Sequence, residues 1–331
     1  MLLPAGPDCV SGVNAAPSRN RIARINGGPM RNKSILIQNY HPPATTALVR
    51  DFKKIGFEVL SPDSDWGRFN WYAPNDGIGS ALISESEYFS RPPGYVLITC
   101  KPAEESLKRV AREHGDLMIL NVAQQYQVYE DGIADVMICP DTETFKNYPH
   151  YVEHKLLYFV QPHISDITPK DHASSYAKKS ISSFVSTPHV WPIASEVFAA
   201  FARLYPHHYV NYGLEAPGGY VDHATANRIM VENFFTAQFK DHEAYGLACL
   251  ESMMLGTPIV TLKRFIEGKT LGEFFLMPDN SIIADTVEEA VEKLLSISFE
   301  DYLRLSENGK ARAYEMTSDE RTVEVLKRVL G

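Results

Sequence analysis

The strongest constraint on the fold is a repeated alternation between short, almost wholly apolar segments and amphipathic stretches. Two of the apolar segments are YVLITC (Tyr95–Cys100) and LMILNV (Leu117–Val122), and a helical pattern covers about Glu104–His114 between them. Strands that are apolar on both faces are typical of parallel sheets that helices cover on both sides. The sequence therefore predicts an α/β protein with doubly wound parallel sheets.

The alternation runs through the chain twice, which predicts two Rossmann-like domains that face each other across a cleft. We expect an N-terminal domain over 30–165, a polar linker over 166–180 and a C-terminal domain over 181–331, whose last helix can pack back on the first domain. Residues 1–29 have no sustained apolar run and are expected to form a flexible tail. The expected strands include Leu156–Val160 at the end of the first half and Phe234–Phe239 and Pro258–Leu262 in the second.

Composition excludes several classes of protein. The chain has 331 residues, 32 Lys and Arg against 41 Asp and Glu, and a net charge of −9, so its overall charge does not indicate a nucleic-acid binder. We find no uncharged apolar run long enough for a transmembrane helix. The four cysteines, Cys9, Cys100, Cys139 and Cys249, are far apart. This spacing favours buried, reduced thiols and a cytoplasmic location.

The segment Lys240–Val260 contains the residues that indicate a ligand-binding site. A polar loop that holds Glu243 follows a predicted strand and leads into a helix, which starts near Gly246 and includes Glu251. A helix N-terminus offers N–H groups and a partial positive charge, which suit a diphosphate, and glycine lets a ligand approach the backbone. Glu251 lies about 7.5 Å further along the helix, roughly the span from a phosphate to a ribose.

Written out, this segment reads E-AYGLACL-E-SMMLGTPIV, in which Glu243 and Glu251 are the two glutamates. It resembles the E-x7-E signature of retaining glycosyltransferases with the GT-B fold, whose usual form is close to E-GFGLxxL-E-AMAxGxPV. The resemblance implies a GT-B fold and a nucleotide-diphospho-sugar donor held by the C-terminal domain. It also implies that no cofactor and no metal is essential.

The same resemblance implies roles for individual residues. Glu243 contacts the donor sugar and is the principal catalytic candidate, and Glu251 binds the ribose. Gly246 and Leu247 supply backbone donors, and Tyr245 is in register with the signature, so it joins the donor-binding set.

Two loops depart from the family pattern. The family often has a glycine-rich first loop, where this chain has Asn39–Pro43, and commonly has an Arg and a Lys in the first loop of the second domain, where Thr187–Pro192 has no cation. Other cations lie at the same predicted sheet edge, and we expect them to balance the diphosphate, with solvated surface cations as the alternative. They are Lys240, Lys263, Arg264 and Lys269.

Two further signals come from the first half. His41 follows the first predicted strand at its carboxyl end, which makes it a catalytic candidate for contact with the acceptor or the sugar; a turn or capping histidine is the alternative. Asp63-Ser64-Asp65 has the D-x-D form of a metal–nucleotide motif, but its loop is rich in turn formers. We therefore expect no metal site.

Together these features predict a retaining glycosyltransferase that moves a sugar from a nucleotide-diphospho-sugar to a hydroxyl of a glycan, lipid-linked or small-molecule acceptor. Helix amides and cations would stabilise the departing diphosphate while the acceptor attacks from the same face. Two alternatives remain open. One is a non-catalytic sugar-nucleotide-binding subunit, which the missing first-loop cations suggest, and the other is a sugar-nucleotide epimerase on the same fold.

Overall fold

The computed structural model describes residues 31–330 apart from 41, 67–74, 76, 100–102, 123–128, 142–143, 155, 165–167, 186–191 and 241–245. The predicted tail, His41, Glu243 and Tyr245 therefore lie outside the described residues, as does most of the 187–192 loop.

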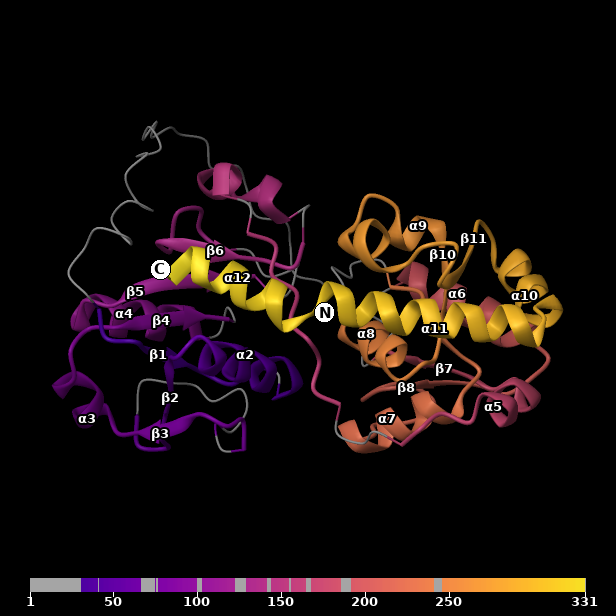
Figure 1. The fold of residues 1–331 in the computed structure, drawn as a ribbon, viewed down its shortest axis with the longest axis horizontal. Helices are drawn as coiled ribbons and strands as arrows, with labels where there is room; N and C mark the ends of the chain where they lie inside the picture. Colours follow the sequence, from indigo (N-terminus) through magenta and orange to yellow (C-terminus); the bar gives the residue numbers. More distant parts are fainter. Residues whose placement is uncertain are drawn as a thin grey trace.

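In the described part of the N-terminal domain, six parallel strands form a sheet in the order β3-β2-β1-β4-β5-β6 (Figure 1). The central strands are buried on both faces, because Ile35 and Leu36 of β1 and Val96 and Leu97 of β4 are all 0% exposed. The elements are β1 (Ser34–Ile37), α2 (Pro42–Lys54), β2 (Glu58–Pro62), β3 (Ala81–Ile83), α3 (Glu85–Ser90), β4 (Tyr95–Ile98), α4 (Glu104–His114), β5 (Leu117–Asn121), β6 (Val136–Ile138), η2 (Thr144–Asn147) and η3 (Pro149–His154).

The C-terminal domain repeats this plan with five described parallel strands in the order β11-β10-β9-β7-β8. The predicted α/β architecture with two Rossmann-like domains is confirmed. The elements are α5 (His172–Lys178), β7 (Ile181–Phe184), α6 (Pro192–Leu204), β8 (Tyr209–Tyr212), α7 (His223–Glu232), β9 (Phe235–Gln238), α8 (Leu247–Met254), β10 (Ile259–Leu262), α9 (Lys263–Ile266), the π-helix η5 (Leu271–Phe275), β11 (Ser281–Ala284), α10 (Val287–Ser296), α11 (Phe299–Met316) and α12 (Asp319–Leu330).

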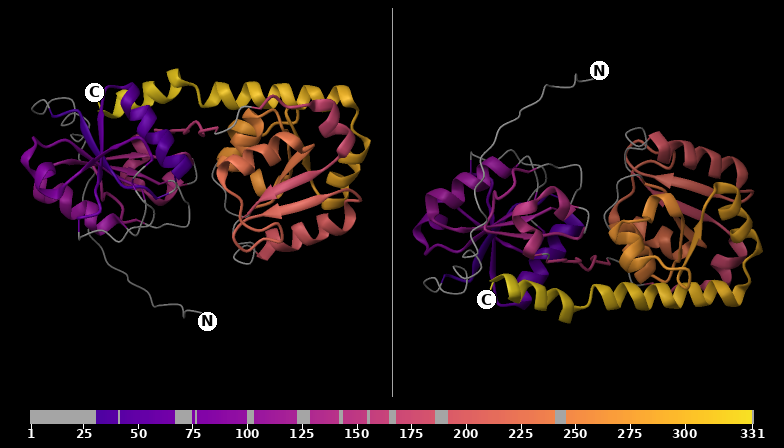
Figure 2. Two further views of the ribbon diagram at one scale, coloured as in Figure 1. Left: turned by 90° about the horizontal axis from the view of Figure 1, so that it is seen from below. Right: turned by 90° about the horizontal axis from the view of Figure 1, so that it is seen from above.

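The last two helices run along one side of the molecule and span both domains (Figure 2). Helix α11 packs on α8 of the second domain, and α12 returns to pack on α2 of the first. An ion pair between Lys54 of α2 and Asp319 at the start of α12 joins these two helices.

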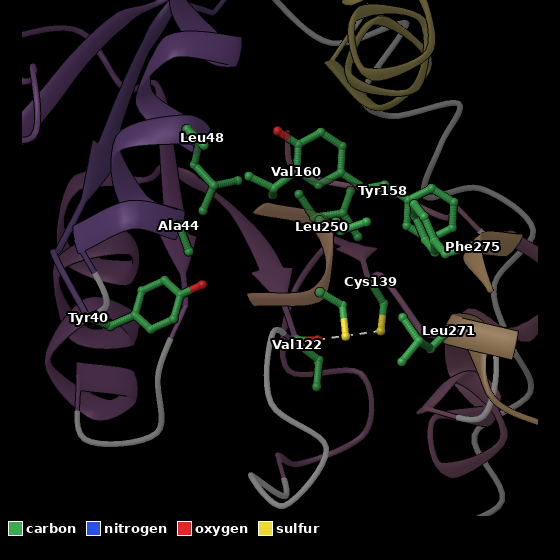
Figure 3. Packing of buried hydrophobic residues seen from close by; sticks show 14 of the residues in the cluster. Tyr40, Ala44, Leu48, Val122, Cys139, Tyr158, Val160, Leu250, Leu271 and Phe275 are labelled. Atoms are coloured by element: carbon green, nitrogen blue, oxygen red, sulfur yellow. Dashed lines mark hydrogen bonds between the residues drawn. The ribbon is translucent and has the colours of Figure 1, made fainter. Parts of the chain in front are cut away.

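The carboxyl edges of the two sheets face each other. Asp141 follows β6 and Thr270 follows α9 in the connection from β10 to β11, and the Thr270 hydroxyl donates a hydrogen bond to the Asp141 carboxylate at 3.0 Å. The connector after the first sheet adds apolar contact, since the ring of Phe159 lies 5.1 Å from that of Phe275. Figure 3 shows the connector residues Tyr158 and Val160 among the buried side chains of both domains.

Two elements differ from the sequence prediction because side-chain contacts outweigh local pattern. Leu156–Val160 forms no strand; one bridge between Leu157 and Cys139 ties it to the sheet before it turns to pack between the domains. The predicted linker, 166–180, contains α5, which begins at His172 and is capped by Asp171, whose side chain accepts from the Ser174 amide. The short elements β3, α3 and β11 have no counterpart in the predicted pattern.

Candidate functional site

The site predicted by the motif begins at the N-terminus of α8. Gly246 is the N-cap residue, with φ of 59° and ψ of 92°, a backbone conformation that favours glycine because a Cβ atom would be strained there. Glycine brings no side-chain acceptor to the N–H groups of the first turn. The helix therefore presents backbone donors at this end, which is an arrangement that suits an anion.

The C-terminus of α8 is fixed by a Schellman motif. The Gly256 amide donates to the Met253 carbonyl at 2.9 Å and the Thr257 amide to the Ser252 carbonyl at 2.9 Å, with Gly256 at φ of 79°. The Ser252 hydroxyl also donates to the Thr236 hydroxyl of β9 at 2.6 Å. These contacts hold the helix rigidly against the sheet, so the side chain of Glu251 starts from a fixed backbone position.

Glu251 projects from α8 toward α7 and is largely buried, with 6% of the residue exposed. Its Oε1 atom accepts a hydrogen bond from Nε2 of His223 at 3.2 Å. Within the described residues, no other side chain forms a hydrogen bond or ion pair with this carboxylate, and Oε2 lacks a partner there. A buried carboxylate of this kind has one oxygen held in place and one available for a ligand hydroxyl.

His223 is the first residue of α7, and Asp222 caps that helix by accepting from the Thr225 amide at 2.7 Å. The ring of His163, from the interdomain connector, stacks on the His223 ring with centroids 6.3 Å apart. The hydrogen bond and charge of Glu251, with a contribution from Asp222, raise the pKa of His223 above 6.5, although partial burial opposes the shift. Below that raised pKa, His223 is therefore an imidazolium that lies beside the Glu251 carboxylate.

Topology brings the predicted cations to the same edge. Lys240 follows β9 and Arg264 lies in α9 directly after β10, the neighbouring strand; Lys269 comes five residues after Arg264. Arg264 is exposed, with its guanidinium 5.0 Å from the Phe265 ring centroid, and Lys240 and Lys269 are half-buried. These residues thus share the carboxyl edge of the sheet with the N-terminus of α8.

Lys263 differs from this group. It pairs with Glu267 at 3.7 Å and lines a cavity of about 950 Å³ beside the edge strand β11, between α9, η5, α10 and α11. Neither Gly246 nor Glu251 lines that cavity. Lys263 is therefore engaged by an ion pair at that cavity, which the N-terminus of α8 does not line.

In the first domain, the loop after β1 is built from buried polar groups. Asn39 and Tyr40 are 2% and 5% exposed, and the backbone amide of Asn39 donates to the Asn75 side-chain oxygen at 2.8 Å.

The D-x-D triplet forms an Asx-type turn, because one carboxylate oxygen of Asp63 accepts a hydrogen bond from the Asp65 amide at 3.1 Å. Among the described residues, no group of His, Cys, Asp and Glu is arranged to hold a metal, and no described helix has the length and apolar character needed to cross a membrane.

The structure thus places Gly246, Leu247 and Glu251 on α8 or at its N-cap, at the sheet edge that the cations share. Sequence reasoning missed His223, which forms a hydrogen bond with Glu251, and His163, whose ring stacks on that of His223. A signal for His223 was present, since it follows an aspartate suited to cap a helix, after a strand of the same sheet. No local pattern marks His163, because its contact depends on the course of the connector.

Comparison with known proteins shows the fold. No protein-family profile and no curated protein matches the sequence. HepE from Anabaena, solved in complex with UDP and glucose, superposes with a TM-score of 0.68 at 10% identity, over 91% of this chain and 99% of HepE. Sucrose-phosphate synthase from Thermosynechococcus elongatus gives 0.60 at 13% identity, over 89% and 97% of the two chains.

TarM from S. aureus gives a TM-score of 0.54 at 12% identity, over 71% of this chain and 55% of TarM, so this chain spans about half the length of that protein. These likenesses, together with the two facing Rossmann-like domains, confirm the predicted GT-B fold.

The His223–Glu251 pair predicts a pH-dependent contribution to stability. Because the folded-state pKa of His223 is raised, the contribution is complete below about pH 6.5 and disappears as the pH rises through the folded-state value. We expect the difference in free energy of unfolding between wild type and His223→Gln to decrease by up to about 1 kcal/mol between pH 5.5 and 8.5. Urea denaturation at several pH values measures it, and a difference that stays constant or grows with pH contradicts the assignment.

Proposed function

We propose that this protein is a retaining glycosyltransferase that moves a sugar from a nucleotide-diphospho-sugar to an acceptor hydroxyl. The observation that supports it best is the buried Glu251 carboxylate on α8, with one oxygen hydrogen-bonded to His223, about 7.5 Å along the helix from the glycine N-cap. The GT-B fold and the E-x7-E resemblance support the same conclusion.

The donor would lie along α8. The diphosphate would accept hydrogen bonds from the N–H groups that follow Gly246, and the ribose hydroxyls would donate to Glu251. Glu243 and Tyr245, in the loop just before Gly246, would lie toward the sugar, with Glu243 as the catalytic carboxylate. The structural neighbour HepE was solved with UDP and glucose, which makes a UDP-sugar the first donor to test.

Departure of the diphosphate needs more charge than the helix supplies, because a helix N-terminus contributes only about half an elementary charge. We assign the remainder to Arg264 and Lys269, with Lys240 close to the motif. Stabilisation of the leaving group by fixed donors and cations fits attack by the acceptor hydroxyl from the same face, with His41 from the first domain near the reacting groups. This scheme requires no metal.

The acceptor is a glycan, a lipid-linked sugar or a small molecule with a hydroxyl group. The protein would work in a reducing compartment such as the cytoplasm, because Cys139 and Cys249 are buried thiols and burial raises the pKa of Cys139 to about 12. The neighbour TarM was solved in complex with fondaparinux, α-GlcNAc-glycerol and UDP, which makes glycans and small hydroxyl compounds the first acceptors to test.

A donor panel tests the proposal. We expect one member of a set of UDP-, GDP- and ADP-sugars to raise the melting temperature, because a ligand that binds the native state stabilises it by mass action. Incubation with that donor should then release free nucleoside diphosphate, through slow hydrolysis or transfer. Binding without release would identify a sugar-nucleotide-binding subunit, and conversion of one nucleotide sugar into another without release would identify an epimerase.

The ribose contact predicts the effect of Glu251→Ala. Loss of charge-assisted hydrogen bonds to the ribose should weaken binding of the preferred nucleoside diphosphate by about 1.5–3 kcal/mol, or roughly ten- to a hundred-fold. Calorimetric titration measures this, with Glu273→Ala, at an exposed position of η5, as the matched control. Unchanged affinity in a folded Glu251→Ala protein would refute the ribose assignment.

The charge argument predicts the effect of the double substitution Arg264→Ala/Lys269→Ala. We expect turnover to fall by about two orders of magnitude or more, as it does when preorganised charge stabilisation is removed, while wild-type activity persists in EDTA. The substitution Arg304→Ala/Lys310→Ala removes the same charge from α11 and serves as the control. Loss of transfer on chelation combined with an active Arg264/Lys269 variant would mean that a metal holds the diphosphate.

A further inference from the structure

We infer that His223 is a positioning residue for the nucleotide ribose: it holds Oε1 of Glu251 so that Oε2 is presented to a ribose hydroxyl, and thereby sets the preference for a ribonucleotide over a 2′-deoxyribonucleotide. This inference rests on the proposed function, because it assumes that Glu251 binds the ribose.

The first support is that the two oxygens of the Glu251 carboxylate have different surroundings. The Glu251 side chain is 7% exposed and the His223 side chain 24%, so their hydrogen bond at 3.2 Å is largely shielded from water. A carboxylate buried without a partner would be costly and free to rotate away. With His223 in place, one oxygen is satisfied inside the protein, and the second has no partner among the described residues.

The second support is that His223 is itself held from two sides. Asp222 fixes the start of α7 through the Thr225 amide, which sets the backbone from which the imidazole extends. His163, which belongs to the connector between the domains, stacks its ring on that of His223, with the ring planes 27° apart. The imidazole is thus fixed by a helix cap and a stacked ring before any ligand arrives, as preorganised recognition requires.

The third support is the location of the array. Helix α7 follows the loop after β8, and α8 follows the loop after β9, so both helices begin at the carboxyl edge of the same parallel sheet. Ligands of doubly wound sheets bind at this edge. A hydroxyl that reaches Oε2 of Glu251 from this edge would meet an acceptor whose orientation His223 has already set.

The test compares matched nucleotides that differ by one hydroxyl. Calorimetric titrations with UDP and 2′-deoxy-UDP, and with the corresponding GDP and ADP pairs, give the discrimination ratio of each protein. For wild type we expect at least about tenfold preference for the ribonucleotide of the preferred base. His223→Leu should reduce this preference to about threefold or less, mainly by weakening ribonucleotide binding.

Two more variants separate positioning from general support of the fold. His223→Gln can still donate a hydrogen bond to Glu251 and should keep most of the preference, whereas His223→Asn is one methylene shorter and should lose it. This pair carries the test if His223→Leu does not fold. His208→Leu, at the amino end of the same sheet, is the control and should behave as wild type.

The outcomes distinguish the inference from the proposed function. If wild type prefers the ribonucleotide and the His223 variants retain that preference, or lose affinity equally for both nucleotides of a pair, the positioning role is wrong and the proposed function stands. If wild type binds a nucleoside diphosphate with no preference, the ribose contact itself is wrong, and the inference fails with it. If wild type binds none of the six nucleotides, the proposed function fails and the inference with it.

Discussion

The Asp51 carboxylate on α2 is completely buried, and it accepts a hydrogen bond from the Tyr158 hydroxyl at 2.8 Å and an ion pair from Arg50 at 3.1 Å. Burial raises the pKa of Asp51, while these partners oppose the shift, so the charged form depends on them. Tyr158 belongs to the connector between the domains, and Arg50 also donates to the carbonyl of Gln161 in that connector at 3.0 Å. The route from one domain to the other is therefore tied to α2.

The same helix receives the C-terminal helix α12, so α2 contacts both segments that join the domains. The hydrogen bond from Thr270 to Asp141 and the edge-to-face contact of Phe159 with Phe275 then close the facing sheet edges. With the edges held in this relation, the segments that follow β6 and α9 meet at the contact between the domains. The proposed transfer between groups bound by different domains depends on this arrangement.

Much of the fold was predictable because its central strands are buried on both faces and its long helices are amphipathic. Helix α4 occupies the predicted range, Glu104–His114, with Leu107 and Val110 fully buried. The failures share one cause, which is that polar side chains act over long sequence separations. Lys170, in the predicted linker, is part-buried, and its amine donates to the carbonyls of Val231 and Asn233 at the end of α7; burial lowers its pKa to about 7.

The candidate site was predictable where the chemistry lies along one helix. The positive φ of Gly246, the burial of Glu251 and the Schellman turn at Gly256 all follow from the motif and its glycines. His223 was not predictable, because its partner is 28 residues away and the contact depends on how α7 and α8 pack. A motif thus predicts the residues that contact a ligand more readily than the residues that hold those contacts in position.

The return of α12 to α2 also affects how the protein is made. On the ribosome, 265 residues separate Lys54 from Asp319, so the first domain emerges long before the helix that covers part of its α2. During synthesis that surface of α2 stays uncovered while the whole second domain is translated. The surface of α2 is therefore covered only when α12 docks on it, after the second domain has been translated.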